Sequence, residues 1–178
     1  EYEHTRHNIG FDVADAFVQK HHATFRTDRL ADVADLKLKG KNITCIKPST
    51  YMNLSGKAIK YWMDKEKIPL ENILVIVDEL ALPLSKIRIR KAGGSAGHNG
   101  LKSIEELLQT TQYNRLRFGI GNDYPKGKQA EFVLSKWAKD EMPLVEKKIS
   151  VCVEAIEQFV LAGVDEAMNG YNKTEITL

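Results

Sequence analysis

The sequence has few residues that could bind a metal ion or form disulfides. Only two of its 178 residues are cysteines, Cys45 and Cys152, and neither belongs to a Cys-x-x-Cys pair. A structural zinc site needs about four closely spaced ligands, so this spacing argues against one. One disulfide could be built from the two cysteines, but a pair of reduced, buried thiols is the simpler expectation.

Several other features are absent from the sequence. It has no signal peptide, no internal repeat and no apolar run of membrane-spanning length, so we expect a cytoplasmic protein. The net charge of +2 is small, so only a local cluster of Lys and Arg could bind a polyanion. No Gly-x-Ser-x-Gly motif is present, and neither cysteine suits a nucleophile, which disfavours an acyl-enzyme.

The length and the apolar pattern predict one α/β domain that spans residues 1–178. Helical and strand periods alternate along the chain, which is typical of a sheet flanked by helices. Helices are expected over residues 11–22, 55–67 and 101–109, and from about residue 144 to Gly163. Ser55 is a plausible N-cap of the second of these.

The strand predictions rest on three kinds of pattern. Residues 33–47 predict two strands that turn at Gly40-Lys41, and the apolar run of residues 73–77 predicts a central strand buried on both faces. Strict alternation over residues 86–90 and 115–120 predicts two further strands, each with one solvent-exposed face.

Polar clusters lie at the ends of these predicted elements, where α/β proteins bind ligands. The clusters are His7-Asn8, Tyr51-Met52-Asn53, Asp78-Glu79 and His98-Asn99. A histidine and an aspartate on separate loops suit a general base and the carboxylate that orients it. Asparagine side chains can hold a water molecule or donate to an oxyanion. The combination favours direct attack by water on a carbonyl carbon.

Each of these residues also has a purely structural interpretation. His7 could cap or pack against a helix, and Asp78 could end its strand in a turn. Asn53 and Asn99 could be helix caps, and Tyr51 could be a half-buried packing residue. The glycine-rich loop 93–100 could bind a phosphate, or its glycines could simply allow close backbone approach.

Cations alternate along two of the predicted strands. They are Lys86, Arg88 and Arg90 on one strand and Arg115 and Arg117 on the other. If the strands are neighbours, these five side chains form a basic patch that could bind nucleic-acid phosphates. The alternative is an ordinary solvated strand face.

Three segments together resemble the bacterial peptidyl-tRNA hydrolase family. They are residues 5–10 (TRHNIG), residues 47–56 (KPSTYMNLSG), and residues 78–83 (DELALP) followed by 93–103 (GGSAGHNGLKS). Their order and spacing match the family over nearly the whole chain. The resemblance implies a monomeric α/β domain with a mixed, twisted sheet and no metal or organic cofactor. It also implies cleavage of the ester that joins a peptide to the 3′ end of tRNA, which recycles tRNA released prematurely from ribosomes.

The resemblance also implies roles for individual residues. His7 corresponds to the family's catalytic base and Asp78 to the acid that stabilises its active form. Asn53 and Asn99 correspond to residues that hold peptidyl-tRNA and position water, and Tyr2 and Tyr51 to residues that line the substrate site. Arg90 and Arg117 correspond to cations that clamp a tRNA phosphate.

The chain departs from the family pattern at two places. The family opens with a strand that ends in Gly-Leu-Gly-Asn-Pro-Gly or similar, just before the position of Tyr2, and the sequence lacks this segment. Val77 and Ala81 stand where the family often has His and Asp, and valine suits a buried strand end. The resemblance also leaves an alternative function, that of a catalytically silent relative that binds structured RNA, as some organellar members of the family do. The joint presence of His7, Asp78, Asn53 and Asn99 favours the enzyme.

Overall fold

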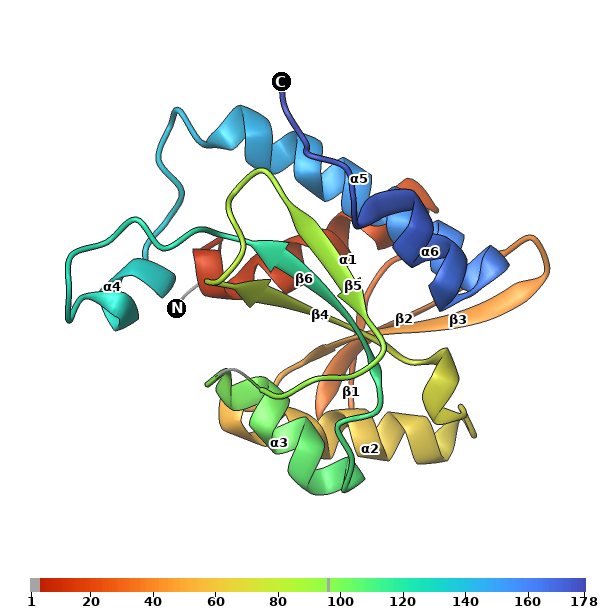
Figure 1. Cartoon of the computed structure of the whole chain (residues 1–178). Coiled ribbons are helices and arrows are strands. Elements are labelled where there is room, and N and C mark those ends of the chain that lie inside the picture. The colour runs from red at the N-terminus through yellow and green to blue at the C-terminus, as the bar shows by residue number, and fades with distance from the viewer. Residues whose placement is uncertain (1–3, 96) are drawn as a thin grey trace. The chain divides into compact units, whose positions relative to one another are not determined.

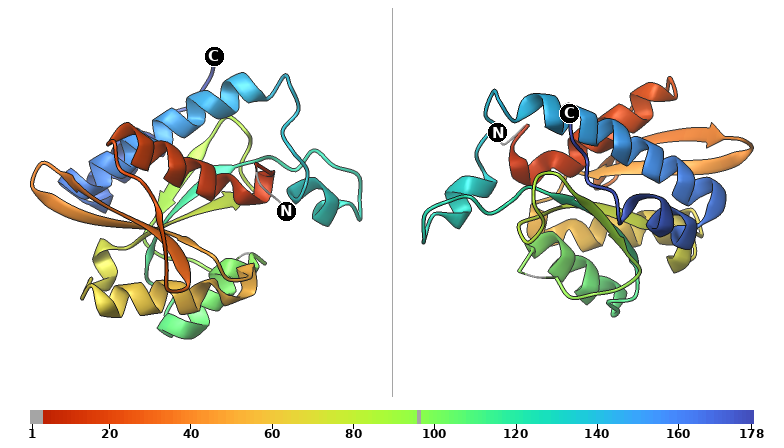
Figure 2. Two further views of the ribbon diagram at one scale, coloured as in Figure 1. Left: turned by 180° about the vertical axis from the view of Figure 1, so that it is seen from behind. Right: turned by 45° about the horizontal axis from the view of Figure 1, so that its top comes forward.

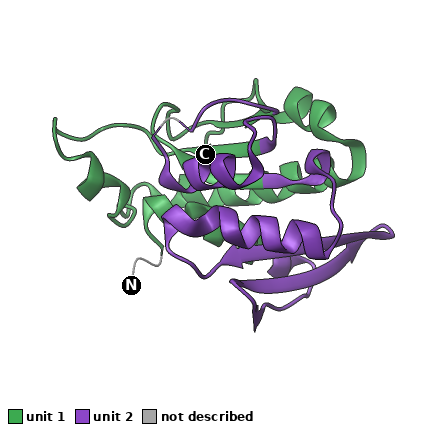
Figure 3. Cartoon of the chain, turned by 90° about the horizontal axis from the view of Figure 1, so that it is seen from below, with its two compact units in different colours: residues 1–17, 75–90, 115–178 green, residues 18–74, 91–114 purple. Residues whose placement is uncertain are grey.

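The computed structural model describes residues 4–95 and 97–178, so the prediction for Tyr2 lies outside the described residues. Two compact units make up the chain (Figure 3). Unit 1 consists of residues 1–17, 75–90 and 115–178, and unit 2 consists of residues 18–74 and 91–114. The predicted α/β class is confirmed, and the described strands pair as two three-stranded sheets. The four predicted helices are found to within two residues at each end.

The sheet of unit 2 is an antiparallel meander. It consists of β1 (Arg26–Asp28), β2 (Ala31–Leu38) and β3 (Lys41–Pro48), in that order. The predicted turn between β2 and β3 is present, one residue earlier than the predicted Gly40-Lys41. Lys39 and Gly40 both have positive φ, at 48° and 82°, as a two-residue type I′ turn requires. Trp62 packs on Ala31 and Val33 and buries one face of this sheet.

Two helices complete unit 2, α2 (Ser55–Lys65) and α3 (Asn99–Leu108), with short 3-10 turns η2 (Met52–Leu54) and η3 (Leu70–Asn72). α2 and α3 contact each other closely, since a Cβ atom on Gly56 would lie 2.3 Å from the Ser103 carbonyl oxygen. The prediction that Ser55 caps α2 is wrong. Ser55 is the first residue of the helix, and its hydroxyl donates to the Met52 carbonyl at 2.7 Å.

The sheet of unit 1 consists of β4 (Leu74–Glu79), β5 (Ile87–Arg90) and β6 (Asn114–Gly119). Among the described strands β6 lies in the middle, so the central position predicted for residues 73–77 belongs to β6 instead. β5 and β6 are antiparallel neighbours, with Arg88 opposite Arg117 and Arg90 opposite Arg115. The predicted cationic strands therefore do lie side by side.

The helical elements that begin in unit 1 are η1 (Arg6–Asn8), α1 (Ile9–Lys20), α4 (Gln129–Val133), α5 (Met142–Ala162) and α6 (Val164–Tyr171) (Figures 1 and 2). α5 packs on α6, and α6 contacts β5. The side-chain amide of Asn172, just after α6, accepts from the Ile89 N–H at 2.7 Å and donates to the Ile89 carbonyl at 2.9 Å. This amide thereby pairs with the backbone of β5 as a neighbouring strand would.

The buried face of α5 is apolar with one exception. Val145, Cys152 and Ile156 are buried, and Lys148 is buried among them with no exposed surface. Its ammonium group donates to the Gly119 carbonyl at 2.7 Å and lies 3.9 Å from the centre of the Phe118 ring. No described helix is both long and apolar enough to cross a membrane.

Candidate active site

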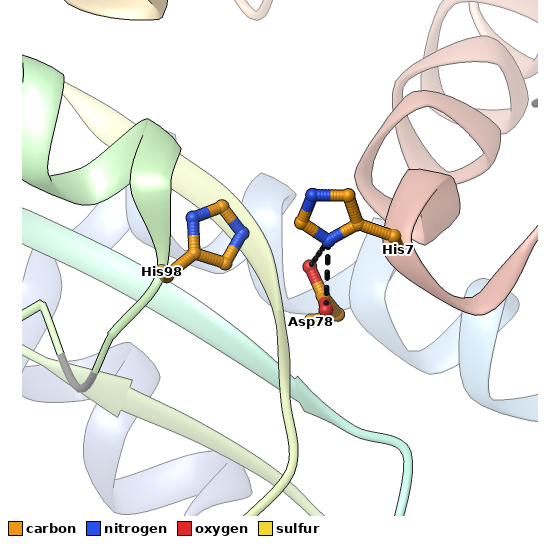
Figure 4. Close-up of side chains that lie close together, drawn as sticks. All are labelled: His7, Asp78 and His98. Atoms are coloured by element: carbon orange, nitrogen blue, oxygen red, sulfur yellow. Dashed lines mark hydrogen bonds and ion pairs between the residues drawn. The ribbon is translucent and has the colours of Figure 1, made fainter. Parts of the chain in front are cut away.

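His7 and Asp78 form a close pair within unit 1. Nδ1 of His7 lies 3.1 Å from each carboxylate oxygen of Asp78 (Figure 4). The Asp78 side chain is 6% exposed and that of His7 is 22% exposed, so the carboxylate is shielded while the imidazole can be reached by solvent. The predicted association of these two residues is confirmed.

The local sequence explains why His7 lies at the end of β4. His7 belongs to the η1 turn, which leads directly into α1, and the fully buried Ile9 anchors the start of that helix. One residue later, a Cβ atom on Gly10 would lie only 2.5 Å from the Ile76 carbonyl oxygen. Only glycine permits this approach of α1 to β4, and Asp78 lies two residues beyond Ile76.

The carboxylate determines both the tautomer and the pKa of His7. An ionised carboxylate only accepts hydrogen bonds, so Nδ1 carries the hydrogen and a neutral ring has its lone pair on Nε2. The hydrogen bond to Asp78 and the attraction of its charge raise the pKa of His7 above its ordinary value, against the opposing effect of burial. The pair therefore has the arrangement of a general base and its orienting acid.

The predicted polar residues of unit 2 lie on neighbouring elements. Asn53 is in η2 and Asn99 is the first residue of α3; both are exposed, and η2 contacts α3. Tyr51 is 81% exposed, so the alternative that it is a packing residue is wrong. Exposed amides and an exposed phenol are suited to contact a ligand rather than the protein core.

His98, not Asn99, caps α3. Its Nδ1 atom accepts from the backbone N–H groups of Gly100 at 3.1 Å and Leu101 at 3.3 Å, and Figure 4 shows the side chain at the start of this helix. The alternative that Asn99 is the cap is therefore wrong. Because His98 occupies these two donors, a phosphate at this helix start would have to displace it, which weakens the phosphate-binding interpretation of the glycine-rich loop.

The five predicted cations differ in their surroundings. Arg115 is fully buried, so the prediction that it belongs to a solvent-exposed face is wrong. Alternation shows only that these side chains share one face of the strand. It does not show whether the rest of the protein covers that face, as it does at Arg115. Arg117 is bound to Glu79 at 3.2 Å, with both side chains 13% exposed. Arg90 is exposed, while Lys86 and Arg88 are half-buried. The exposed cationic area is therefore smaller than predicted.

Other candidate chemistry is poorly represented in the described residues. Neither unit by itself gathers three His, Cys, Asp or Glu side chains within metal-ligand distance. Cys45 and Cys152 are both thiols rather than halves of a disulfide, and Cys45 is only half-buried. Burial raises the pKa of Cys152 to about 12, so its nucleophilic thiolate form is strongly disfavoured.

Arg6, the residue before His7, makes contacts that the sequence did not predict. Arg6 is 7% exposed, and its side-chain partners are Ser135, Lys136 and Glu141. A sequence separation of about 130 residues leaves no local pattern from which these contacts could be read. The available signal was an arginine directly before the candidate base.

An α/β fold with a histidine–carboxylate pair at a strand end defines a candidate hydrolase that acts through a general base.

The family model "Peptidyl-tRNA hydrolase" matches residues 1–177. A relative of that name from Phocaeicola vulgatus is 49% identical over 97% of this chain and 92% of its own length. One from Bacteroides fragilis is 48% identical with the same coverage. The crystal structure of peptidyl-tRNA hydrolase from Acinetobacter baumannii superposes with a TM-score of 0.91 at 31% identity, covering 98% of this chain and 89% of that one. The chain belongs to the peptidyl-tRNA hydrolase family, and it is an enzyme of the hydrolase class.

Proposed function

We propose that this chain hydrolyses the ester between the peptide and the 3′ end of tRNA in peptidyl-tRNA, and so recycles tRNA from prematurely released chains. Family membership supports the reaction class. The observation that carries the catalytic assignment is the contact between His7 Nδ1 and both oxygens of Asp78 at 3.1 Å.

In this proposal His7 is the base that activates water. Nε2 accepts a proton as the water oxygen attacks the ester carbonyl carbon, and Asp78 stabilises the imidazolium that results. The tetrahedral intermediate then collapses, and the tRNA 3′ oxygen leaves with the proton returned by the imidazolium. The products are the peptide carboxylic acid, which releases its proton to solvent, and tRNA with an intact terminal hydroxyl.

The exposed polar residues of unit 2 would bind the substrate. We assign Asn53 and Asn99 to holding the peptidyl-tRNA end and positioning water, because both amides are exposed on contacting elements. Tyr51 offers an exposed ring for stacking or hydrogen bonding. Tyr2 is retained as a substrate-site residue on the family resemblance alone.

Arg90 and Arg117 are proposed to bind a tRNA phosphate. Arg90 is exposed, which suits an electrostatic contact. Arg117 is paired with Glu79, so binding a phosphate would require it to exchange or share that carboxylate. We further propose that residues 1–178 act as a single-domain, cytoplasmic monomer.

Hydrolysis of N-acetyl-aminoacyl-tRNA, compared with free aminoacyl-tRNA, tests the proposal. We expect the parent chain to cleave the N-blocked substrate and His7→Ala to lose roughly 10²–10⁴-fold in kcat while tRNA binding persists. His21→Ala, a histidine beyond the end of α1, is the matched control and should match the parent. A His7→Ala variant with parent turnover would exclude His7 as the base, and a folded parent that binds tRNA without cleaving it would favour the silent RNA-binding alternative.

A further inference from the structure

Arg6, the residue before His7, is enclosed by side chains of one distant segment. Its guanidinium group lies 4.4 Å from the centre of the Phe132 ring and 5.0 Å from that of Trp137. One terminal nitrogen donates to the Ser135 hydroxyl and, at 2.8 Å, to the Lys136 carbonyl. The other donates to Glu141 at 2.7 Å. Aromatic contacts and an ion pair thus hold the group in one orientation.

All of these partners lie in residues 132–141, which we call the α4–α5 connection. The main chains of the two segments are also joined. The Arg6 N–H donates to the Ser135 carbonyl at 3.1 Å, and Thr5 forms an antiparallel bridge with Lys136. η1 also contacts α4, which Figures 1 and 2 show beside the start of α1. The turn that carries His7 is therefore attached to the α4–α5 connection by both main chain and side chain.

The chemistry of these contacts requires an arginine. The planar guanidinium can donate in several fixed directions while its faces contact aromatic rings, whereas a lysine ammonium is a point charge that cannot reproduce this geometry. Charge-assisted hydrogen bonds and cation–π contacts both strengthen when water is excluded, as it is at a residue that is 7% exposed. Arg6→Lys would keep the positive charge but lose the fixed directions of the hydrogen bonds and the planar contacts with the aromatic rings.

The η1 turn itself is short. It contains three residues, and its own backbone is closed by hydrogen bonds from the Asn8 N–H to the Thr5 carbonyl at 3.1 Å and from the Ile9 N–H to the Arg6 carbonyl. Catalytic groups need to be held to within about half an ångström, and a displacement of about 1 Å can cost roughly 10²-fold in rate. A three-residue turn gains such precision from contacts made outside it.

We propose that Arg6 is a positioning residue for His7: it fastens the η1 turn to the α4–α5 connection and so holds the imidazole against Asp78. The role of His7 in this inference rests on the proposed function. Arg6 itself touches neither Asp78 nor His7 in any hydrogen bond described above, so its effect passes through the backbone of the turn.

The test compares Arg6→Lys with the parent and with Arg29→Lys, a matched control at an exposed arginine that lies over the Tyr61 ring in unit 2. Two measurements are made on each protein. The first is the pKa of His7 from an NMR pH titration of its ring protons, which requires no substrate. The second is kcat and KM for N-acetyl-aminoacyl-tRNA across pH, at a temperature where thermal melts show all three proteins to be folded.

For Arg6→Lys we expect the His7 pKa to fall by about half a unit or more, because the bond to Asp78 loosens. We also expect kcat to fall about tenfold with KM within about twofold of the parent. Because the charge is retained, such a shift cannot come from removing a neighbouring cation. Glu141→Gln should reproduce part of both effects, and the double variant should be no worse than Arg6→Lys alone.

An unchanged His7 pKa together with parent kcat in folded Arg6→Lys would overturn the inference. A lowered melting temperature with neither change would assign Arg6 a stabilising role only. If the parent itself cleaves no ester, the proposed function fails, but the titration still decides whether Arg6 positions His7.

Discussion

Nδ1 of His7 lies 3.1 Å from both carboxylate oxygens of Asp78, and this contact governs when the histidine carries a proton. The carboxylate stabilises the imidazolium, so the pKa of His7 is raised above 6.5 although burial opposes the charge. A base must be neutral to accept a proton, and the contact therefore sets the acidic limit of the proposed reaction.

The first prediction is a dependence of kcat/KM on pH. Activity should fall as the pH falls through a value above 6.5, because a protonated His7 cannot activate water. In Asp78→Asn the acidic limb should move to lower pH, and the plateau should fall roughly 10²–10⁴-fold because the imidazolium loses its partner. Asp64→Asn, at an exposed carboxylate paired with Lys60, is the control. If the acidic limb of the pH profile stayed at the same pH in Asp78→Asn, Asp78 would not be the carboxylate that raises the pKa of the base.

The second prediction concerns the dependence of tRNA binding on salt. Arg90→Ala and Arg117→Ala should each weaken binding and reduce the slope of log K against log salt by roughly 0.7–0.9 if one phosphate contact is lost. Glu79→Gln should tighten binding, because it releases Arg117 from its carboxylate partner. Filter binding or fluorescence titration at several salt concentrations measures both effects. Unchanged slopes in both arginine variants would remove these residues from the phosphate site.

The third prediction concerns Lys148 and stability at alkaline pH. Burial lowers the pKa of Lys148 from 10.5 to about 7, so above that pH the unfolded chain binds more protons at this site than the folded chain does. The contribution of this group to stability should therefore rise as the pH increases from about 7 to about 10.5, by on the order of 3–5 kcal/mol, and stay constant below about pH 7. Urea denaturation of the parent and of Lys148→Met across this range measures the difference. Parallel stability curves for the two proteins would show that Lys148 keeps an ordinary pKa.

The fourth prediction concerns the contact between α2 and α3. In Gly56→Ala the new methyl group would lie 2.3 Å from the Ser103 carbonyl oxygen, so the helices must move apart at a cost of about 1–3 kcal/mol. Because η2 and α3 carry Asn53 and Asn99, we also expect a higher KM. Gly170→Ala is the matched control, since its methyl group meets no atom within 4 Å in α6, and it should stabilise the protein by roughly 0.5–1 kcal/mol. Equal melting temperatures for the two variants would argue against the close contact.

The sequence alone predicted the main elements of the fold and the candidate site residues. Helical and strand periods are local properties, so α1, α2, α3 and α5 could be predicted to within two residues, as could the turn at Gly40. Three motifs in family order identified His7 and Asp78, and their contact across 71 residues is confirmed. The alternation of cations also predicted correctly which residues of β5 and β6 share a face.

Only the tertiary structure decided which segments pack against each face and each end of a helix or strand. Arg115 is buried and Arg117 is bound to Glu79, although both alternate like solvated residues. Lys148 occupies a core position on α5, three residues after Val145 and four before Cys152, because its ammonium group reaches the Gly119 carbonyl. Arg6 is fixed by residues about 130 positions away. A sequence pattern specifies the direction in which a side chain points, but its partner, exposure and pKa depend on segments that only folding brings together.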